Sequence, residues 1–283
     1  MVRSAKRVSN HEATVYMFEI RPRVAPMDLI ADHITHHFGA LDVLDDVSFT
    51  VGAGEVVAIV GPSGCGKSTL LSILGGLLQP SSGSAQLRGA PPPESLNPLT
   101  FVFQDFALLP WCTVEENVEF PLLHTGLSLS ARQAVVADAL RRTGLTDFRE
   151  TYPKQLSGGM RQRVGIARAL AVRPAILLMD EPLSALDSQT RELLMEDFIG
   201  LLADGSMGAV YVTHNLEEAV RLADRIVVLS RRPGRVREVV TIPMTRNERG
   251  GLQAREKLLT LQNELWSLIR EEAVDAEREV QHA

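Results

Sequence analysis

One glycine-rich segment, residues 61–68 with the sequence Gly-Pro-Ser-Gly-Cys-Gly-Lys-Ser, constrains this chain more than any other. Before it lies an apolar run, residues 55–60, that is typical of a buried strand, and after it residues 68–78 have a helical pattern. A glycine-rich turn between strand and helix matches G-x-x-x-x-G-K-[ST], in which successive backbone N–H groups face phosphate oxygens. The segment predicts an α/β fold with a phosphate-binding loop, in which Lys67 reaches the β- and γ-phosphates and the Ser68 hydroxyl binds Mg²⁺.

The backbone of this loop, rather than its side chains, is expected to hold the phosphates, because the helix that follows adds a favourable partial charge at its N-terminus. The thiol of Cys65 lies beside Lys67 and that helix N-terminus, which predicts reactivity toward thiol reagents and protection by a bound nucleotide. The candidate nucleotide-binding residues of this segment are Gly61, Pro62, Ser63, Gly64, Cys65, Gly66, Lys67, Ser68 and Thr69.

A second apolar strand pattern, residues 176–179, ends in two carboxylates, Asp180 and Glu181, 113 residues after Lys67. An aspartate at such a strand end holds Mg²⁺ in phosphate-loop enzymes, and a glutamate one residue on can polarise an attacking water as general base. Alone this pattern would favour a solvated strand end. Together with the phosphate loop it predicts a metal ligand and a catalytic base.

The third pattern is Leu-Ser-Gly-Gly-Met-Arg-Gln-Arg at residues 156–163, ahead of a helical run over 164–171. Ser157 is a good N-cap, and Gly158 and Gly159 allow a close backbone approach, so this is a second phosphate-binding helix N-terminus. One nucleotide in an isolated kinase-like fold does not need two such sites. They are explained if the second site of each copy completes the first site of its partner.

These motifs together resemble the nucleotide-binding subunit of an ATP-binding-cassette (ABC) transporter over residues 28–240, with Met160 where glutamine is commoner. The resemblance implies a RecA-like core, an antiparallel β subdomain and an inserted helical subdomain. It also implies roles for further residues: adenine stacking by Phe38, contact of Gln104 with Mg²⁺ and the attacking water, a dimer-crossing D-loop at residues 184–187 ending in Asp187, and a switch histidine, His214.

Residues 109–118 and 230–235 are similar to the nitrate/sulfonate/taurine importer subgroup of that family. The resemblance implies an ATPase that uses ATP and Mg²⁺ to drive solute import by closure of a cassette dimer. Its partners would be transmembrane permease subunits, a second copy of itself or a homologous cassette and, indirectly, a solute-binding protein. The alternative from another class is a soluble ABC ATPase acting on nucleic acid or ribosomes.

Composition bears on this choice. The formal net charge is −6, which disfavours a nucleic-acid partner, and two cysteines cannot form a disulfide framework. No apolar run approaches the roughly 20 residues that a spanning helix needs. We therefore expect an intracellular protein at the cytoplasmic face of the membrane, whose partners cross the bilayer.

The predicted organisation is an extension over residues 1–26 with a short strand at 14–20, a cassette over 27–240, and a C-terminal segment over 241–283. Within the cassette, residues 110–165 form the helical subdomain, with a capping box beginning at Ser130. The C-terminal segment is an amphipathic helix that packs on the cassette itself or on a second copy. Its apolar side carries Leu258, Leu261, Leu265, Leu268 and Ile269.

The loop after Gln104 is unusually apolar and is either the docking surface for a membrane partner or a cover for the core of the helical subdomain. Separately, three histidines just before Phe38 suggest a metal site, which is the less favoured interpretation because no further ligands accompany them. The apolar loop residues are Phe106, Leu108, Leu109, Trp111 and Val114, and the histidines are His33, His36 and His37.

Overall fold

The structure is a computed structural model. Within the predicted N-terminal extension, β2 (Met17–Phe18) pairs antiparallel with β1 (Ala5–Lys6), and the rest of the strand predicted at 14–20 lies outside the described residues. The residues that the structure describes are 5–6, 17–18, 26–184, 186–203 and 205–282, with only the backbone described for 5–6, 17–18, 247, 250, 252–253 and 271–282.

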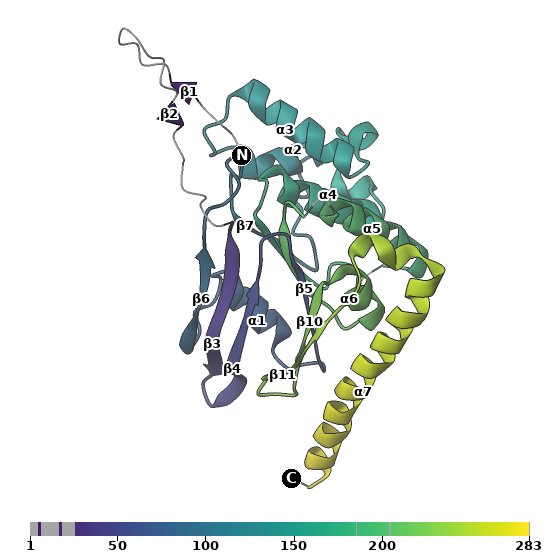
Figure 1. Cartoon of the computed structure of the whole chain (residues 1–283). Coiled ribbons are helices and arrows are strands. Elements are labelled where there is room, and N and C mark those ends of the chain that lie inside the picture. Colours follow the sequence, from purple (N-terminus) through teal and green to yellow (C-terminus); the bar gives the residue numbers. More distant parts are fainter. Residues whose placement is uncertain (1–4, 7–16, 19–25, 185, 204, 283) are drawn as a thin grey trace.

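A six-stranded sheet forms the centre of the molecule in the order β11-β10-β5-β9-β8-β7, and every neighbouring pair is parallel except β10 with β11 (Figure 1). Alternate residues of β5 enter two different hydrophobic cores, Val56 on one face and Val57 on the other. Burial on both faces explains why this strand is a continuous apolar run. The strands are β5 (Val56–Val60), β7 (Leu99–Val102), β8 (Ile176–Asp180), β9 (Gly208–Val212), β10 (Arg225–Leu229) and β11 (Val236–Thr241).

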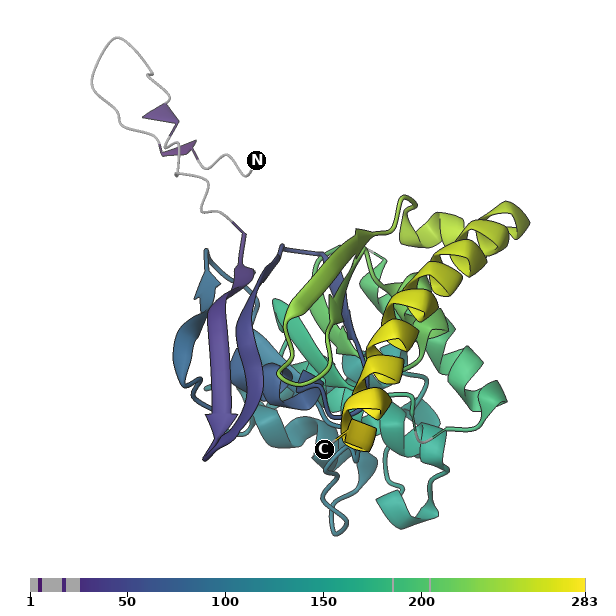
Figure 2. The ribbon, with the colours of Figure 1, turned by 90° about the horizontal axis from the view of Figure 1, so that it is seen from below.

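A second, antiparallel sheet has the order β4-β3-β6, with β3 at Asp28–Phe38, β4 at Leu41–Val51 and β6 at Ser82–Arg88. Its apolar face shares one core with helix α1 and one face of the central sheet. Figure 2 shows this sheet on the side of the molecule opposite to α7. The chain thus has the α/β layers expected for a phosphate-loop cassette, with an added antiparallel sheet.

The helices cover the other face of the central sheet and form a separate helical layer. Parts of α4, α5, α6 and α7 share the core of that face, whereas α2, α3 and α4 enclose a third core between Val114 and Val172. The helices are α1 (Lys67–Leu74), α2 (Val114–Glu119), α3 (Leu129–Arg142), α4 (Gly158–Ala171), α5 (Ser188–Leu202), α6 (Leu216–Leu222) and α7 (Leu252–His282), with short 3₁₀ turns at Phe120–Leu122, Thr146–Phe148, Pro153–Gln155 and Arg246–Gly250.

The capping box predicted at Ser130 is wrong. Helix α3 begins two residues earlier, with Ser128 as its N-cap, and the Ser128 hydroxyl accepts from the N–H of Ala131 at 3.3 Å. Ser130 already lies in the first turn, where its hydroxyl is 3.1 Å from that of Ser128. Two serines two residues apart offer the same local signal, and the earlier one has the extended backbone that an N-cap needs.

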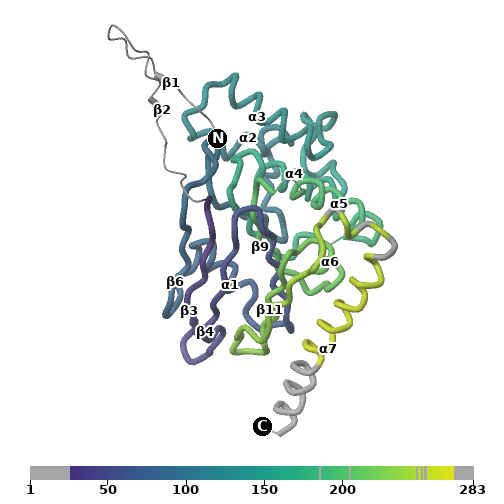
Figure 3. Tube along the Cα trace, in the orientation of Figure 1, coloured from purple at the N-terminus to yellow at the C-terminus, as the bar shows by residue number. Residues whose placement is uncertain are grey.

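The part of helix α7 up to residue 270 lies beside α6 (Figure 3). Leu258 and Leu265 are buried in the core that also contains α5 and α6, and Leu261 packs against it. The cassette-packing interpretation of this helix is therefore correct for one of its faces. No helix in the described part of the chain is long and apolar enough to span a bilayer.

Candidate active site

The glycine-rich loop turns tightly between β5 and α1 and encloses the side chain of Lys67. A Cβ on Gly61 would lie 2.8 Å from the Leu229 carbonyl, and Gly66 has φ +101°, so both positions require glycine. The buried Lys67 ammonium donates to the carbonyls of Gly61 and Pro62, each at 2.9 Å. The lysine is thus held at the loop, where a phosphate would meet its charge.

The strand ends bring Ser68 and Asp180 together although 112 residues separate them. The Ser68 hydroxyl donates to Asp180 Oδ1 at 3.2 Å. Burial raises the pKa of Asp180, Glu181 next to it acts in the same direction, and the Ser68 hydrogen bond and Lys67 oppose them. A hydroxyl and a partly buried carboxylate are oxygen ligands that suit Mg²⁺, and a divalent cation would offset the unfavourable burial of the Asp180 charge.

Glu181 and His214 face each other across the ends of β8 and β9. Nδ1 of His214 is 3.1 Å from Oε2 of Glu181. Glu181 has φ +44°, a region that side-chain-bearing residues seldom adopt, and its N–H donates to the Val212 carbonyl at 2.9 Å. This backbone turn aims the carboxylate at the histidine, and such strain is concentrated at functional sites.

Gln104 follows β7 and reaches the same region through Ser184, which the sequence placed in the D-loop without indicating this contact. Its amide donates to the Ser184 hydroxyl at 3.2 Å, and that hydroxyl donates to the Glu181 carbonyl at 2.9 Å. Ser184 therefore connects the loop after β7 to the turn that carries Glu181. A serine four residues after an aspartate gives no signal of such a bridge.

Ser157 caps α4, and its hydroxyl accepts from the N–H of Met160 at 3.2 Å. Asp187 caps α5 in the same manner, and hydrogen bonds from Thr190 hold the pKa of Asp187 below its usual range. The first turns of the two helices touch, since a Cβ on Gly159 would lie 2.4 Å from Cγ2 of Thr190, while one on Gly158 would have ordinary contacts. The two N-termini are therefore positioned as one unit.

Phe38 ends β3 and is exposed, with its ring edge-on to His36 at a centroid distance of 4.6 Å. An exposed aromatic ring held by a neighbour is a suitable platform for a base. Of the other histidines, His33 bonds to Asp46 at 2.6 Å. No group of three metal-ligating side chains occurs among the described residues, so the three histidines carry no metal-site argument.

The thiol of Cys65 is buried beneath the loop. Its sulfur lies 2.9 Å from where a Gly61 Cβ would be and 4.0 Å from Nζ of Lys67. A thiol reagent would have to displace the loop to reach this sulfur. The predicted thiol reactivity needs an accessible sulfur, which this structure does not provide.

The apolar loop after Gln104 mostly covers the protein's own interior. Phe106 and Val114 are buried, whereas Trp111 is 73% exposed. The guanidinium of Arg168 in α4 donates to the Ala107 carbonyl at 2.7 Å and to that of Phe106, and both loop residues have positive φ. Burial lowers the pKa of Arg168. Of the loop residues predicted to dock a membrane partner, Trp111 is the one that is largely exposed. The hydrogen bonds of Arg168 hold the loop against α4.

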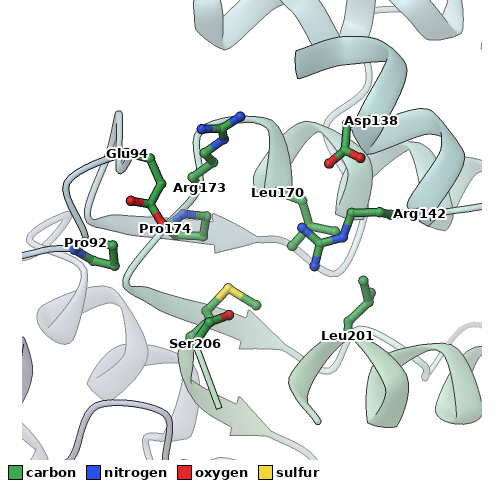
Figure 4. Close-up of a pocket in the computed structure, with 10 residues that line it drawn as sticks. Pro92, Glu94, Asp138, Arg142, Leu170, Arg173, Pro174, Leu201 and Ser206 are labelled. Carbon is green, nitrogen blue, oxygen red and sulfur yellow. The ribbon is translucent and has the colours of Figure 1, made fainter. Parts of the chain in front are cut away.

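A separate cavity of about 280 Å³ lies between the helical layer and the sheet (Figure 4). Arg142 and Arg173 line it together with two carboxylates, Glu94 and Asp138, so its walls carry both signs of charge. None of the sequence-predicted site residues contributes to this lining, which sets the cavity apart from the phosphate loop.

A family model described as ABC transporter matches residues 44–184. The chain is 48% identical over 198 residues to the taurine import ATP-binding protein TauB of Burkholderia pseudomallei, covering 70% of this chain and 76% of that one. It is 42% identical over 211 residues to the bicarbonate transport ATP-binding protein CmpD of Synechocystis sp., covering 74% and 75% respectively.

Among solved structures, the chain is similar to the ATP-binding cassette MJ0796, determined as a dimer in a post-hydrolysis state bound to ADP and Pi. The TM-score is 0.65 at 34% sequence identity, and the likeness covers 76% of this chain and 99% of that one.

Proposed function

This chain belongs to the ABC transporter family as an ATP-hydrolysing subunit, and we propose that it energises import of a small solute of the nitrate, sulfonate or taurine type across the cytoplasmic membrane. The names of two relatives, one for taurine import and one for bicarbonate transport, support this class of solute. The proposed location is the cytoplasmic face of the membrane, on permease subunits that receive solute from a binding protein.

The observation that carries the proposal is that two pairs of side chains lie close together at the carboxyl ends of parallel strands. Ser68 lies beside Asp180, and Glu181 lies beside His214. Ligands bind at this edge of open parallel sheets. Phosphate binding and water activation would therefore take place side by side.

In the proposed reaction the loop 61–69 holds the ATP phosphates, with Lys67 on the β- and γ-phosphates and Phe38 on the adenine. Glu181 accepts a proton from the attacking water or orients it, and His214, 3.1 Å away, holds that carboxylate in place. Gln104 contributes from the other side through its contact with Ser184.

Mg²⁺ would neutralise phosphate charge between Ser68 and Asp180, with Gln104 as a further candidate ligand. The donors present are oxygen atoms of a hydroxyl, a carboxylate and an amide, the types that Mg²⁺ prefers. Water and phosphate oxygens would complete the shell, which agrees with so few protein ligands.

A second copy, or a homologous cassette, would supply the other half of each site. Ser157, Gly158 and Gly159 offer the N-terminus of α4, and Asp187 lies on the adjoining helix N-terminus. Such a helix end suits a phosphate. ATP would then join two copies, and hydrolysis would let them separate.

The motion would pass to the permease through the loop after Gln104. Trp111 is its exposed apolar side chain, and Phe120 of the helical layer is also exposed. Arg168 ties the loop to α4, the helix that begins at Ser157. A movement of the α4 N-terminus is thereby connected to the proposed docking surface.

The Glu181→Gln variant tests the proposal. Hydrolysis should fall by about 100-fold or more, because the general base is lost, while ATP binding persists and traps a closed dimer. ATPase assays, ATP-binding titrations and sedimentation measure these outcomes. In a complex with the permease and binding protein, taurine, nitrate or an alkanesulfonate should stimulate the wild-type ATPase but not the variant. Normal hydrolysis by the variant would overturn the assignment of the base.

A further inference from the structure

Helix α7 exposes two large apolar side chains on a flank that the cassette does not cover. Leu259 and Trp266 are 57% and 58% exposed, and they lie seven residues apart on one flank of the helix. The face that packs on the cassette is the neighbouring one, with Leu258 and Leu265. Tryptophan is among the residues enriched at protein–protein interfaces, so an exposed Trp266 beside a groove marks a candidate contact site.

This flank opens into a groove of about 350 Å³ that reaches the catalytic region. The groove joins α7 to the start of α6, and its wall includes the switch histidine, whose Nδ1 is 3.1 Å from Glu181. One side chain therefore belongs both to the proposed active site and to the groove. The lining residues are His214, Asn215, Leu216, Gln262, Asn263 and Trp266.

We propose that the flank of α7 carrying Leu259 and Trp266, with its groove, is part of the interface between two copies of this chain in the ATP-bound dimer. The inference rests on the proposed function, in which a second copy closes the active site. His214 is largely exposed, and a copy that covers it continues directly onto the groove. The interface then extends from the nucleotide to the C-terminal helix, so that α7 responds to closure.

A single-tryptophan protein makes this measurable, because Trp111 and Trp266 are the two tryptophans of the sequence. In the Trp111→Phe, Glu181→Gln double variant, sedimentation reports the dimer and acrylamide quenching reports the exposure of Trp266. With Mg-ATP we expect a dimer in which the quenching constant falls by about half or more and the emission shifts to the blue. Without nucleotide the constant should stay high.

A second variant measures what the contact contributes. In the Glu181→Gln background, Trp266→Ala should weaken ATP-driven dimerisation by about 30-fold, because a tryptophan that becomes buried in an interface is a frequent hot spot. Glu264→Ala is the matched control, since Glu264 is exposed on another side of the same helix, and it should leave the dimer constant unchanged. Circular dichroism before and after heating confirms that both variants fold.

The outcomes separate this inference from the proposed function. A dimer that forms with ATP while Trp266 stays equally quenched, or that Trp266→Ala leaves equally strong, overturns the role of α7 alone. Failure of Glu181→Gln to dimerise with ATP overturns the shared site and this inference together. A fall in quenching in the ATP-bound monomer would show closure of α7 on its own chain and would also overturn the inference.

Discussion

The cluster of Ser68, Asp180, Glu181 and His214 at the strand ends differs from the N-terminus of α4 in how many partners its side chains find within the chain. In the cluster, side chains bond to one another across long stretches of sequence, as Ser68 does with Asp180 and His214 with Glu181. At the start of α4, the hydrogen bonds of Ser157 in the described part of the chain stay within the helix. One region is assembled within the chain, and the other presents a helix end.

This difference indicates that the two regions have different roles in one site. A helix N-terminus leaves N–H groups without intrahelical partners, and Ser157 satisfies the one at Met160. The remaining partial charge favours an anion. A preassembled half and an open half in the same chain are what a site shared between two copies requires.

The largest test is to inactivate each half in a different copy. Lys67→Ala removes the phosphate contact of the first half, and Ser157→Asp keeps a cap on α4 but places a negative charge where phosphate would bind. Each variant alone should lose about 100-fold or more of its ATPase activity. Mixed in equal amounts, they should recover about a quarter of wild-type activity, because half of random dimers are mixed and each mixed dimer has one intact site.

Each variant alone at twice its concentration is the control. Its ATPase activity should not recover, because its dimers contain no intact site. The shared site is overturned if the mixture stays as inactive as each variant alone while sedimentation shows that mixed dimers form. It is also overturned if Ser157→Asp alone hydrolyses ATP at the normal rate, because the open half would then have no part in the site.

The sequence predicted the assembled half better than its surroundings. A buried strand must end where its apolar run ends, so the position of Asp180 follows from the apolar pattern, and that of Lys67 follows from the glycine-rich motif after β5. The contacts made by Ser184 and Arg168 do not follow, because each depends on a loop brought close by the fold. Long-range hydrogen bonds leave no periodic trace in a sequence.

The apolar loop shows a second limit of pattern. Trp111 is exposed, whereas Val114 a few residues on is fully buried in the core of the helical layer, and both are simply apolar in the sequence. The buried side chain of Asn117 holds that loop in shape. Its amide nitrogen donates to the Leu109 carbonyl at 3.1 Å and to the Thr113 carbonyl at 2.9 Å. Local composition cannot distinguish a docking surface from a core without the turn that separates them.

A change of one methyl group tests how the open half is positioned. Gly159→Ala should destabilise the protein by about 1–3 kcal/mol, since its Cβ would lie 2.4 Å from Cγ2 of Thr190 and would push α4 from α5. In a Thr190→Ser protein that methyl is gone while a hydroxyl for Asp187 remains. There the same substitution should be neutral or stabilising by up to about 1 kcal/mol, because alanine favours helix over glycine.

Urea denaturation of the four proteins in this cycle gives the coupling between the two positions. A Gly159→Ala cost that is equal with Thr190 and with Ser at that position would show that the contact does not hold the two helix ends together. In that case Ser157 and Asp187 would have to be positioned by other contacts.

The smallest expected effect separates the two roles of Ser157. Ser157→Ala removes the cap and should lower the free energy of unfolding by about 1 kcal/mol, whereas Ser157→Asp should keep most of it, because aspartate also caps. For ATP-driven dimerisation in the Glu181→Gln background the order should reverse, with alanine retaining the backbone N–H groups of Gly158 and Gly159 and aspartate repelling the phosphate. Urea unfolding and sedimentation measure the two orders. If both properties follow the same order, Ser157 acts only as a cap, and the open end of α4 then owes its charge preference to the helix alone.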